Sequence, residues 1–215
     1  MINKNLFEAV ESGSVEKVKQ ALSKEKVNTT TYYGAKSIIL ATENGEIEII
    51  KILLKSSVKI PRASFWTNCY NVALLSLSKA AQNGSTEILK LLLDYGASVE
   101  KKDLRIAFIE AILNRNLEMT KMLLDAGVNV NIKDDNGFTP LMCAILLPFE
   151  NQDVLVEWLL KAGAHVNVKR KYWTREERNQ VWKVSTALTY AEELGSTQIV
   201  EMLKNVKDYR SLKEV

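Results

Sequence analysis

The sequence predicts an all-α repeat protein in which short helix-turn-helix units stack in a row. A small residue recurs before each predicted corner between two helices, and these residues are Ala9, Ala41, Ala80, Ala111, Ala144 and Ala191. Glycine follows at most corners, and each corner leads into a segment whose aliphatic residues recur at i, i+3 and i+4. Since no single unit of this kind buries its own faces, stability must come from contacts between neighbouring units.

The clearest unit runs from Leu117 to Ile145. Its first segment has helical spacing, and Gly127 follows where the end of a helix favours a left-handed residue. The VNVN stretch at 128–131 alternates with period two, and Asn136-Gly137 is a turn dipeptide, so we expect an extended hairpin here. Thr139-Pro140 predicts the next helix, with Thr139 as N-cap and Pro140 at the first helical position.

This unit resembles the ankyrin repeat in its D-x-x-G-x-T-P-L run, the following alanine and Leu-rich helix, and the G-A-x-V-N end. Ankyrin units recur about every 33 residues, and the resemblance extends over residues 3–205 in about six units, some of them degenerate. It implies one ankyrin-repeat solenoid over 1–215, with β-hairpin-like fingers. The expected units are 3–33, 34–65, 66–102, 103–136, 137–184 and 185–215.

Several units depart from the pattern. The first helices expected at 37–45 and 186–195 keep the pattern, whereas Arg115 takes the place of the corner glycine in the fourth unit. Insertions are expected at 57–71 and 169–183. In the second insertion Thr174 and Glu177 have the spacing of a capping box, which predicts a short helix from Arg175 to Lys183.

The composition is that of an ordinary folded protein, with 47% hydrophobic residues in 215 and a net charge of only +3. No apolar run is long enough for a membrane span, and the first ten residues do not resemble a signal peptide. We therefore expect a cytoplasmic monomer that does not contact membranes. Abundant Lys, Asn and Ile suggest an AT-rich genome, so one interpretation is an intracellular bacterium that delivers the protein to a host cell.

Nothing in the sequence predicts catalysis, a metal or a cofactor. His165 is the only histidine and has no ligand-spaced companions, so we assign it a structural or surface role. Cys143 falls on the buried side of a predicted helix, and Cys69 lacks an activating histidine. The glycines stand at corners and turns rather than in a phosphate-binding loop.

The resemblance implies that the fingers and the first helices line a concave groove that binds a protein partner. Candidate contacts at the fingers and before the corners are Tyr32, Tyr33, Glu43, Asn44, Asn83, Asn114, Lys133, Asp135, Asn136 and Phe138. Aromatic residues of the two insertions could also anchor a partner or could pack onto the helices, and these are Phe65, Trp66, Tyr70, Tyr172, Trp173 and Trp182.

We therefore expect a non-catalytic protein-binding module of the adaptor, inhibitor or immunity type. A second hypothesis is binding of nucleic acid or an acidic surface through 169–183. This stretch contains six basic residues and only two acidic ones. A solvated basic loop is the commoner fate of such a run, so we expect a protein partner rather than nucleic acid. A third hypothesis is a pathogen effector that binds a host protein.

Overall fold

The computed structural model describes residues 3–24, 32–56, 72–94, 104–176 and 179–211. These residues form twelve helices and two strands. The chain divides into two compact units, Met1–Asn114 and Arg115–Val215, and each is described by itself. The predicted class, a mostly helical fold of helix-turn-helix units, is confirmed.

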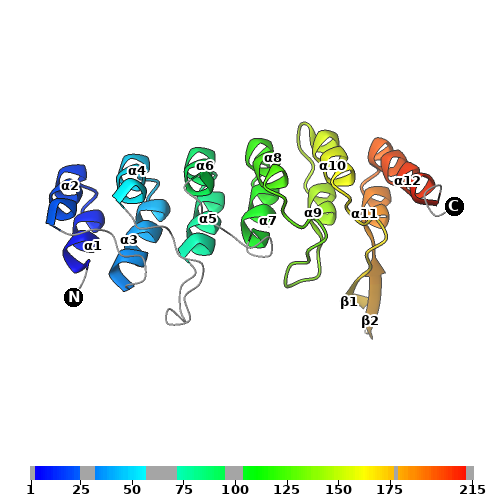
Figure 1. Cartoon of the computed structure of the whole chain (residues 1–215). Helices are drawn as coiled ribbons and strands as arrows, with labels where there is room; N and C mark the ends of the chain where they lie inside the picture. The colour runs from blue at the N-terminus through cyan, green and yellow to red at the C-terminus, as the bar shows by residue number, and fades with distance from the viewer. Residues whose placement is uncertain (1–2, 25–31, 57–71, 95–103, 177–178, 212–215) are drawn as a thin grey trace. The chain divides into compact units, whose positions relative to one another are not determined.

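The first unit consists of two layers of helices (Figure 1). In one layer α1, α3, α5 and α7 pack side by side in chain order, and in the other α2 packs on α4 and α4 on α6. The helices are α1 (Lys4–Glu11), α2 (Val15–Lys24), α3 (Tyr32–Glu43), α4 (Ile47–Ser56), α5 (Val72–Gln82), α6 (Thr86–Asp94) and α7 (Arg105–Leu113).

The repeating alanines define the inner side of the first layer. Ala41, Ala80 and Ala111 are 0% exposed, and Ala9 is 8% exposed. Because alanine leaves the helices free to approach closely, the row can bury larger side chains such as Phe108 between its members. In the second unit Ala144 and Ala191 are also 0% exposed, so all six of these alanines are buried, as the repeat pattern requires.

The corners between paired helices require left-handed backbone. Gly13, Gly45 and Gly84 have φ of 64°, 75° and 66°, which glycine adopts without steric cost. Arg115 has φ 56°, so it holds the predicted corner conformation even though it carries a side chain. A left-handed residue with a Cβ costs roughly 1–2 kcal/mol, which the surrounding helices must offset.

The second unit combines five helices with one β-hairpin. The helices are α8 (Leu117–Asp125), α9 (Pro140–Leu146), α10 (Gln152–Lys161), α11 (Ala187–Glu193) and α12 (Thr197–Ser211). The strands β1 (Arg170–Glu176) and β2 (Asn179–Ser185) pair in antiparallel fashion. Helix α9 packs on α10 and α11, and α12 packs on α10 and α11. As predicted, Thr139 caps α9 by accepting a hydrogen bond from the Met142 amide at 3.3 Å, and Pro140 begins the helix.

Two sequence predictions are wrong. The described residues of the stretch 175–183 form no helix, because they belong to β1 and β2, in which Trp173 pairs with Trp182 and Tyr172 with Lys183. Aromatic and β-branched residues favour such strands over the short helix that the capping-box spacing predicted. Helix α3 begins at Tyr32 rather than at 37, so Tyr32, Tyr33 and Ala35 lie in a helix and not in a finger. The Tyr33 ring packs on Phe7 of α1, with ring centroids 5.6 Å apart, and this contact holds the added first turn.

Candidate interaction surfaces

Corresponding positions of α3, α5 and α7 form an exposed surface on the first unit, which we call the aligned helix face. When the helices are superposed on their buried alanines, three positions per helix recur at the spacing i, i+4 and i+7, which places them on one side of each helix. All nine residues are half-buried or exposed, and they are Lys36, Leu40, Glu43, Leu75, Lys79, Gln82, Ile106, Glu110 and Leu113.

The chemistry of this face changes from α3 to α7. Glu43 forms an ion pair with Lys79 at 2.9 Å, which ties α3 to α5. At the start of α3 the Lys36 ammonium lies 4.8 Å from the ring centroid of Tyr32, whose side chain is 53% exposed. On α7 the face is mainly apolar, because Ile106 and Leu113 are 38% and 44% exposed. The face therefore presents fixed charges beside exposed apolar side chains.

Two predicted contact residues have structural roles beside this face. The Asn83 amide donates hydrogen bonds to the carbonyl oxygens of Thr42 and Glu43, at 3.3 and 2.8 Å. One repeat further on, Asn114 donates to Ala81 and Gln82, at 2.9 and 3.4 Å. Each side chain thus satisfies carbonyl groups at the end of the preceding first-layer helix, which no helical partner reaches.

A finger in the second unit lies between α8 and α9. Asp134 shapes it, because its Oδ1 accepts hydrogen bonds from the amides of Asn136 and Phe138, at 2.9 and 2.7 Å. The finger contains no assigned strand, although Gly137 provides the predicted turn with φ 81°. Lys133, Asp135 and Asn136 are exposed at its tip. Exposure is what a residue that contacts a partner needs, and their role as contact residues stays a prediction.

Arg170 joins this finger to the base of the hairpin. Its guanidinium carbon lies 3.8 Å from the ring centroid of Phe138 and 4.8 Å from that of Tyr172. The same group donates to the Asn136 carbonyl at 2.9 Å and to the Tyr190 hydroxyl at 3.2 Å. Phe138 and Tyr172 are consequently half-buried and serve the packing of the finger and the hairpin. The sequence analysis did not single out Arg170, because three of its partners, Asn136, Phe138 and Tyr190, are at least twenty residues away in the chain.

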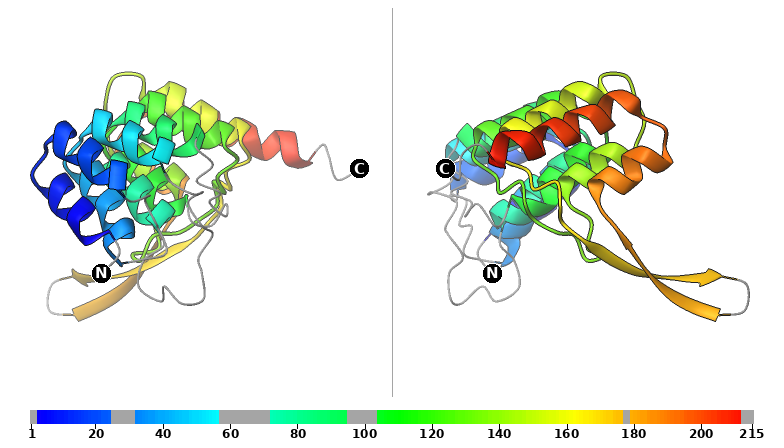
Figure 2. Two further views of the ribbon diagram at one scale, coloured as in Figure 1. Left: turned by 60° about the vertical axis from the view of Figure 1, so that its left-hand side comes forward. Right: turned by 90° about the vertical axis from the view of Figure 1, so that its right-hand side faces the viewer.

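Beyond this base the hairpin exposes a different set of side chains. Trp182 and Val184 are 54% and 48% exposed, and Lys171 and Lys183 are exposed as well. Figure 2 shows the two strands extending away from α11 and α12. Lys171 pairs with Val184 in the strand register, so Lys171, Trp182 and Val184 occupy one face of the hairpin.

The other predicted contacts have mixed positions. Glu43 and Asn44 are exposed, and Tyr33 is half-buried against Phe7. Phe65, Trp66, Tyr70 and the side chain of Trp173 lie outside the described residues. The sequence analysis missed Ile106. Its position in α7 corresponds to that of Leu75 in α5, so an alignment of the two helices shows an apolar residue at the same position of the aligned helix face in both.

Among the described residues, no group of three or more His, Cys, Asp or Glu side chains could hold a metal ion. The amide of the exposed His165 donates to Asn131 Oδ1 at 2.7 Å, which fixes the start of the next finger. Cys143 is 6% exposed, and burial, aided by the nearby Asp134 carboxylate, raises the pKa of its thiol from 9.0 to about 11. A thiol in that state is a poor nucleophile near neutral pH.

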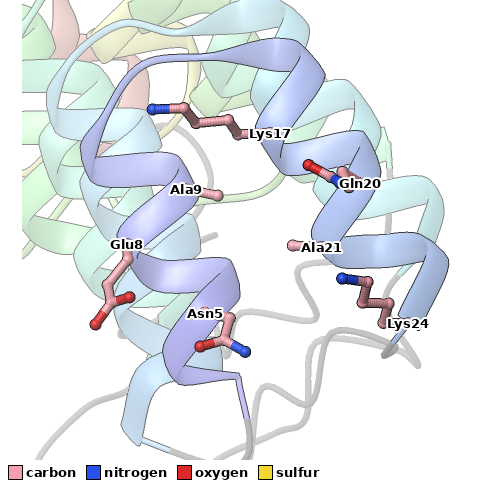
Figure 3. A pocket seen from close by; sticks show the side chains of 7 residues that line it. All are labelled: Asn5, Glu8, Ala9, Lys17, Gln20, Ala21 and Lys24. Atoms are coloured by element: carbon pink, nitrogen blue, oxygen red, sulfur yellow. The ribbon is translucent and has the colours of Figure 1, made fainter.

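Two open pockets lie against single helix pairs rather than at these surfaces. The first lies between α1 and α2, where Figure 3 shows Ala9 and Ala21 between the helices and Lys17 and Lys24 beside them. The second is lined by residues of α11 and α12 and by Gly195. Neither brings together buried polar groups that would orient a small ligand. Within the described segments, no helix combines the length and apolar character that crossing a bilayer needs.

Comparisons with known proteins agree with this architecture. Residues 77–170 match the family model for ankyrin repeats (3 copies). The crystal structure of EF0377, an ankyrin repeat protein, matches at 22% identity with a TM-score of 0.69, over 95% of this chain and 98% of that one. An ankyrin repeat domain from Acinetobacter baumannii AYE matches at 23% identity with a TM-score of 0.70, over 94% and 97%.

The ankyrin repeat domain of Bcl-3, described as a unique member of the IkappaB protein family, matches at 20% identity. Its TM-score is 0.63, over 94% of this chain and 86% of that one. A comparison with curated protein sequences gives no match. Residues 77–170 therefore contain ankyrin repeats, and the chain has the ankyrin-repeat fold. Ankyrin repeats are generally protein–protein interaction modules, and the fold is generally a non-catalytic binding scaffold.

Proposed function

We propose that this protein is a non-catalytic binding module that captures a protein partner on the aligned helix face of its first unit. The observation that carries the proposal is the exposure of Ile106 and Leu113 on a surface that also carries charged and polar side chains. The exposed Tyr32 lies beside Lys36 at the edge of this surface. The half-buried Leu40 and Leu75 continue the apolar part of this surface on α3 and α5. Exposed apolar side chains on neighbouring helices, with polar ones beside them, are typical of a protein interface with a central anchor and a polar rim.

The face is held in place before any partner arrives. The Glu43–Lys79 ion pair and the amides of Asn83 and Asn114 connect neighbouring helices, and the alanine row beneath them is buried. A surface that is already ordered loses little conformational entropy on binding, which favours affinity. A protein that binds through such a face would act by covering its partner, as an inhibitor, adaptor or immunity-type protein does.

The test compares the proteins captured from the source cells by three tagged forms of the chain. The wild type should enrich at least one protein that the double variant Ile106→Asp, Leu113→Asp loses by about tenfold or more, because desolvating a carboxylate in an apolar contact is costly. The control variant Lys90→Asp changes an exposed residue on α6 and should retain the partner. The proposal fails if the double variant folds normally and captures the same proteins as the wild type.

A further inference from the structure

We infer that the β-hairpin 170–185 is a second docking site, separate from the aligned helix face, for an acidic protein segment that binds in extended conformation. Such a segment would lie along the hairpin as an added strand, with alternate apolar side chains beside Trp182 and Val184. Its carboxylates would meet the basic side chains of the hairpin.

The geometry of the sheet favours an extended ligand. In the described part of the chain this sheet has two strands, and each pairs with the other along one side only. A strand edge offers backbone groups at regular spacing to a further strand, which is the mode of recognition used in β-strand addition. The strands are seven residues long, so an added strand of similar length could pair along them.

The exposed side chains define the ligand's chemistry. Trp182 and Val184 stand two residues apart on β2 and therefore share one face, which also carries Lys171 through its pairing with Val184. Lys183 lies on the opposite face, in register with Tyr172. Exposed basic residues here are Lys169, Lys171 and Lys183. An alternating segment paired with β2 would place its apolar side chains on the face of Trp182 and Val184 and its carboxylates on the face of Lys183, and the charge of Lys171 adds to the attraction.

The base of the hairpin is fixed, so binding need not order it. Arg170 stacks on Phe138 and Tyr172 and bonds to Asn136 and Tyr190, while Ser185 at the other strand end is 3% exposed. These contacts use the part of the hairpin nearest α11 and leave Lys171, Trp182 and Val184 exposed. An exposed tryptophan on a hairpin that is anchored at its base has the properties of an interface anchor.

The experiment measures binding of synthetic peptides to the full chain by fluorescence anisotropy. The probe is a peptide of alternating Val and Glu, and we expect saturable binding below about 1 mM. A Val–Lys peptide should not bind, and a Val–Glu peptide with a central proline should bind about tenfold or more weaker, since proline cannot donate to a strand pair. A single-stranded DNA probe distinguishes binding to phosphate groups from binding to a peptide, because binding to phosphate groups would weaken steeply with added salt.

Variants locate the site. Trp182→Ala and the charge reversal Lys171→Glu, Lys183→Glu should each weaken the Val–Glu peptide about tenfold or more, and the charge reversal should gain binding of the Val–Lys peptide. Lys90→Glu is the matched control and should bind as the wild type does. The Ile106→Asp, Leu113→Asp variant should also bind the peptide normally, which separates this proposal from that of the aligned helix face.

Several results would overturn the inference. They are the absence of binding to the Val–Glu peptide, equal binding of the proline-containing peptide, and unchanged affinity in both the Trp182→Ala and the charge-reversed variant. Tighter binding of the DNA probe than of any peptide would also overturn it and would assign the hairpin to nucleic acid.

Discussion

Arg170 connects three parts of the second unit through one planar side chain. It stacks on Phe138 and Tyr172 and donates hydrogen bonds to Asn136 and to Tyr190. A lysine could supply the charge but not the flat surface or the diverging N–H groups. We predict that Arg170→Lys lowers the free energy of unfolding by about 1–3 kcal/mol.

Urea denaturation of the full chain measures this effect. The neighbouring variant Lys171→Arg is the control, because Lys171 is exposed, and it should change stability by less than about 0.5 kcal/mol. Equal effects of the two substitutions would show that the stacked guanidinium contributes nothing specific.

Cys143 makes stability depend on pH in the alkaline range. Its thiol has a pKa raised from 9.0 to about 11 in the folded protein, chiefly because burial disfavours the thiolate. Because the thiol ionises more readily in the unfolded chain, the folded protein keeps the full contribution of this group to stability below about pH 9 and loses it as the pH rises toward 11. Two pKa units correspond to roughly 2–3 kcal/mol of free energy of unfolding.

The measurement is the difference in free energy of unfolding between the wild type and Cys143→Ala at pH 8 and at pH 11. Other groups titrate in both proteins, so their contributions cancel in this comparison. We expect the wild type to lose more stability than the variant between these values, and parallel curves would contradict the burial of a neutral thiol.

At the scale of elements, Asn83 and Asn114 connect consecutive first-layer helices. Each amide donates to two carbonyl groups of the preceding helix or its end. Because water can partly replace these bonds at the surface, we predict that Asn83→Ala and Asn114→Ala each cost about 0.5–1.5 kcal/mol. Thermal or urea unfolding measures this cost, with the exposed Asn44→Ala as control. If the Asn83→Ala and Asn114→Ala variants were as stable as the control, the two side chains would not stabilise the fold, and only their predicted role in partner binding would remain.

The hairpin is the element whose structure most directly contradicts the sequence prediction. If Trp173 pairs with Trp182, nuclear Overhauser effects should connect the backbone protons of opposing residues across β1 and β2. A helix would instead connect residues three apart in the chain. We predict cross-strand signals at 172–174 with 181–183, and sequential helical signals there would contradict the pairing.

The successes and failures of the sequence analysis have a common physical cause. Thr139-Pro140 predicts the start of α9 correctly because capping depends on neighbours in the chain. The repeated alanines and corner glycines predict the helix pairs because the same local requirement recurs in each unit. These features carry most of the fold.

The failures occur where distant residues decide. Thr174 and Glu177 have capping-box spacing, but Arg170 fixes the start of this segment to a finger more than thirty residues earlier. The first turn of α3 depends on contact with Phe7, and the roles of Asn83 and Asn114 depend on the preceding repeat. Sequence spacing placed Asn83 and Asn114 just before the corners between helices, but it did not predict that their side chains would bond to the preceding helix.

At the scale of the whole molecule, the chemistry is that of surfaces rather than of a cleft. Among the described residues the ion pairs lie at the surface, as Lys51–Glu87 and Lys79–Glu43 do, and the free cysteine Cys143 is buried. The exposed apolar side chains concentrate on α3 and α7 in one unit and on β2 in the other, with Leu194 also exposed after α11. This distribution is the basis for proposing partner binding.

The most direct test of that proposal is site-specific photo-crosslinking in the source cells. A benzophenone amino acid replaces Leu113 or Ile106 on the aligned helix face, and Lys90 on α6 in the control. The proposal predicts light-dependent adducts with the same partner from Leu113 and Ile106 and no such adduct from Lys90. Adducts from Lys90 alone, or no adducts from either face position in a folded protein, would contradict it.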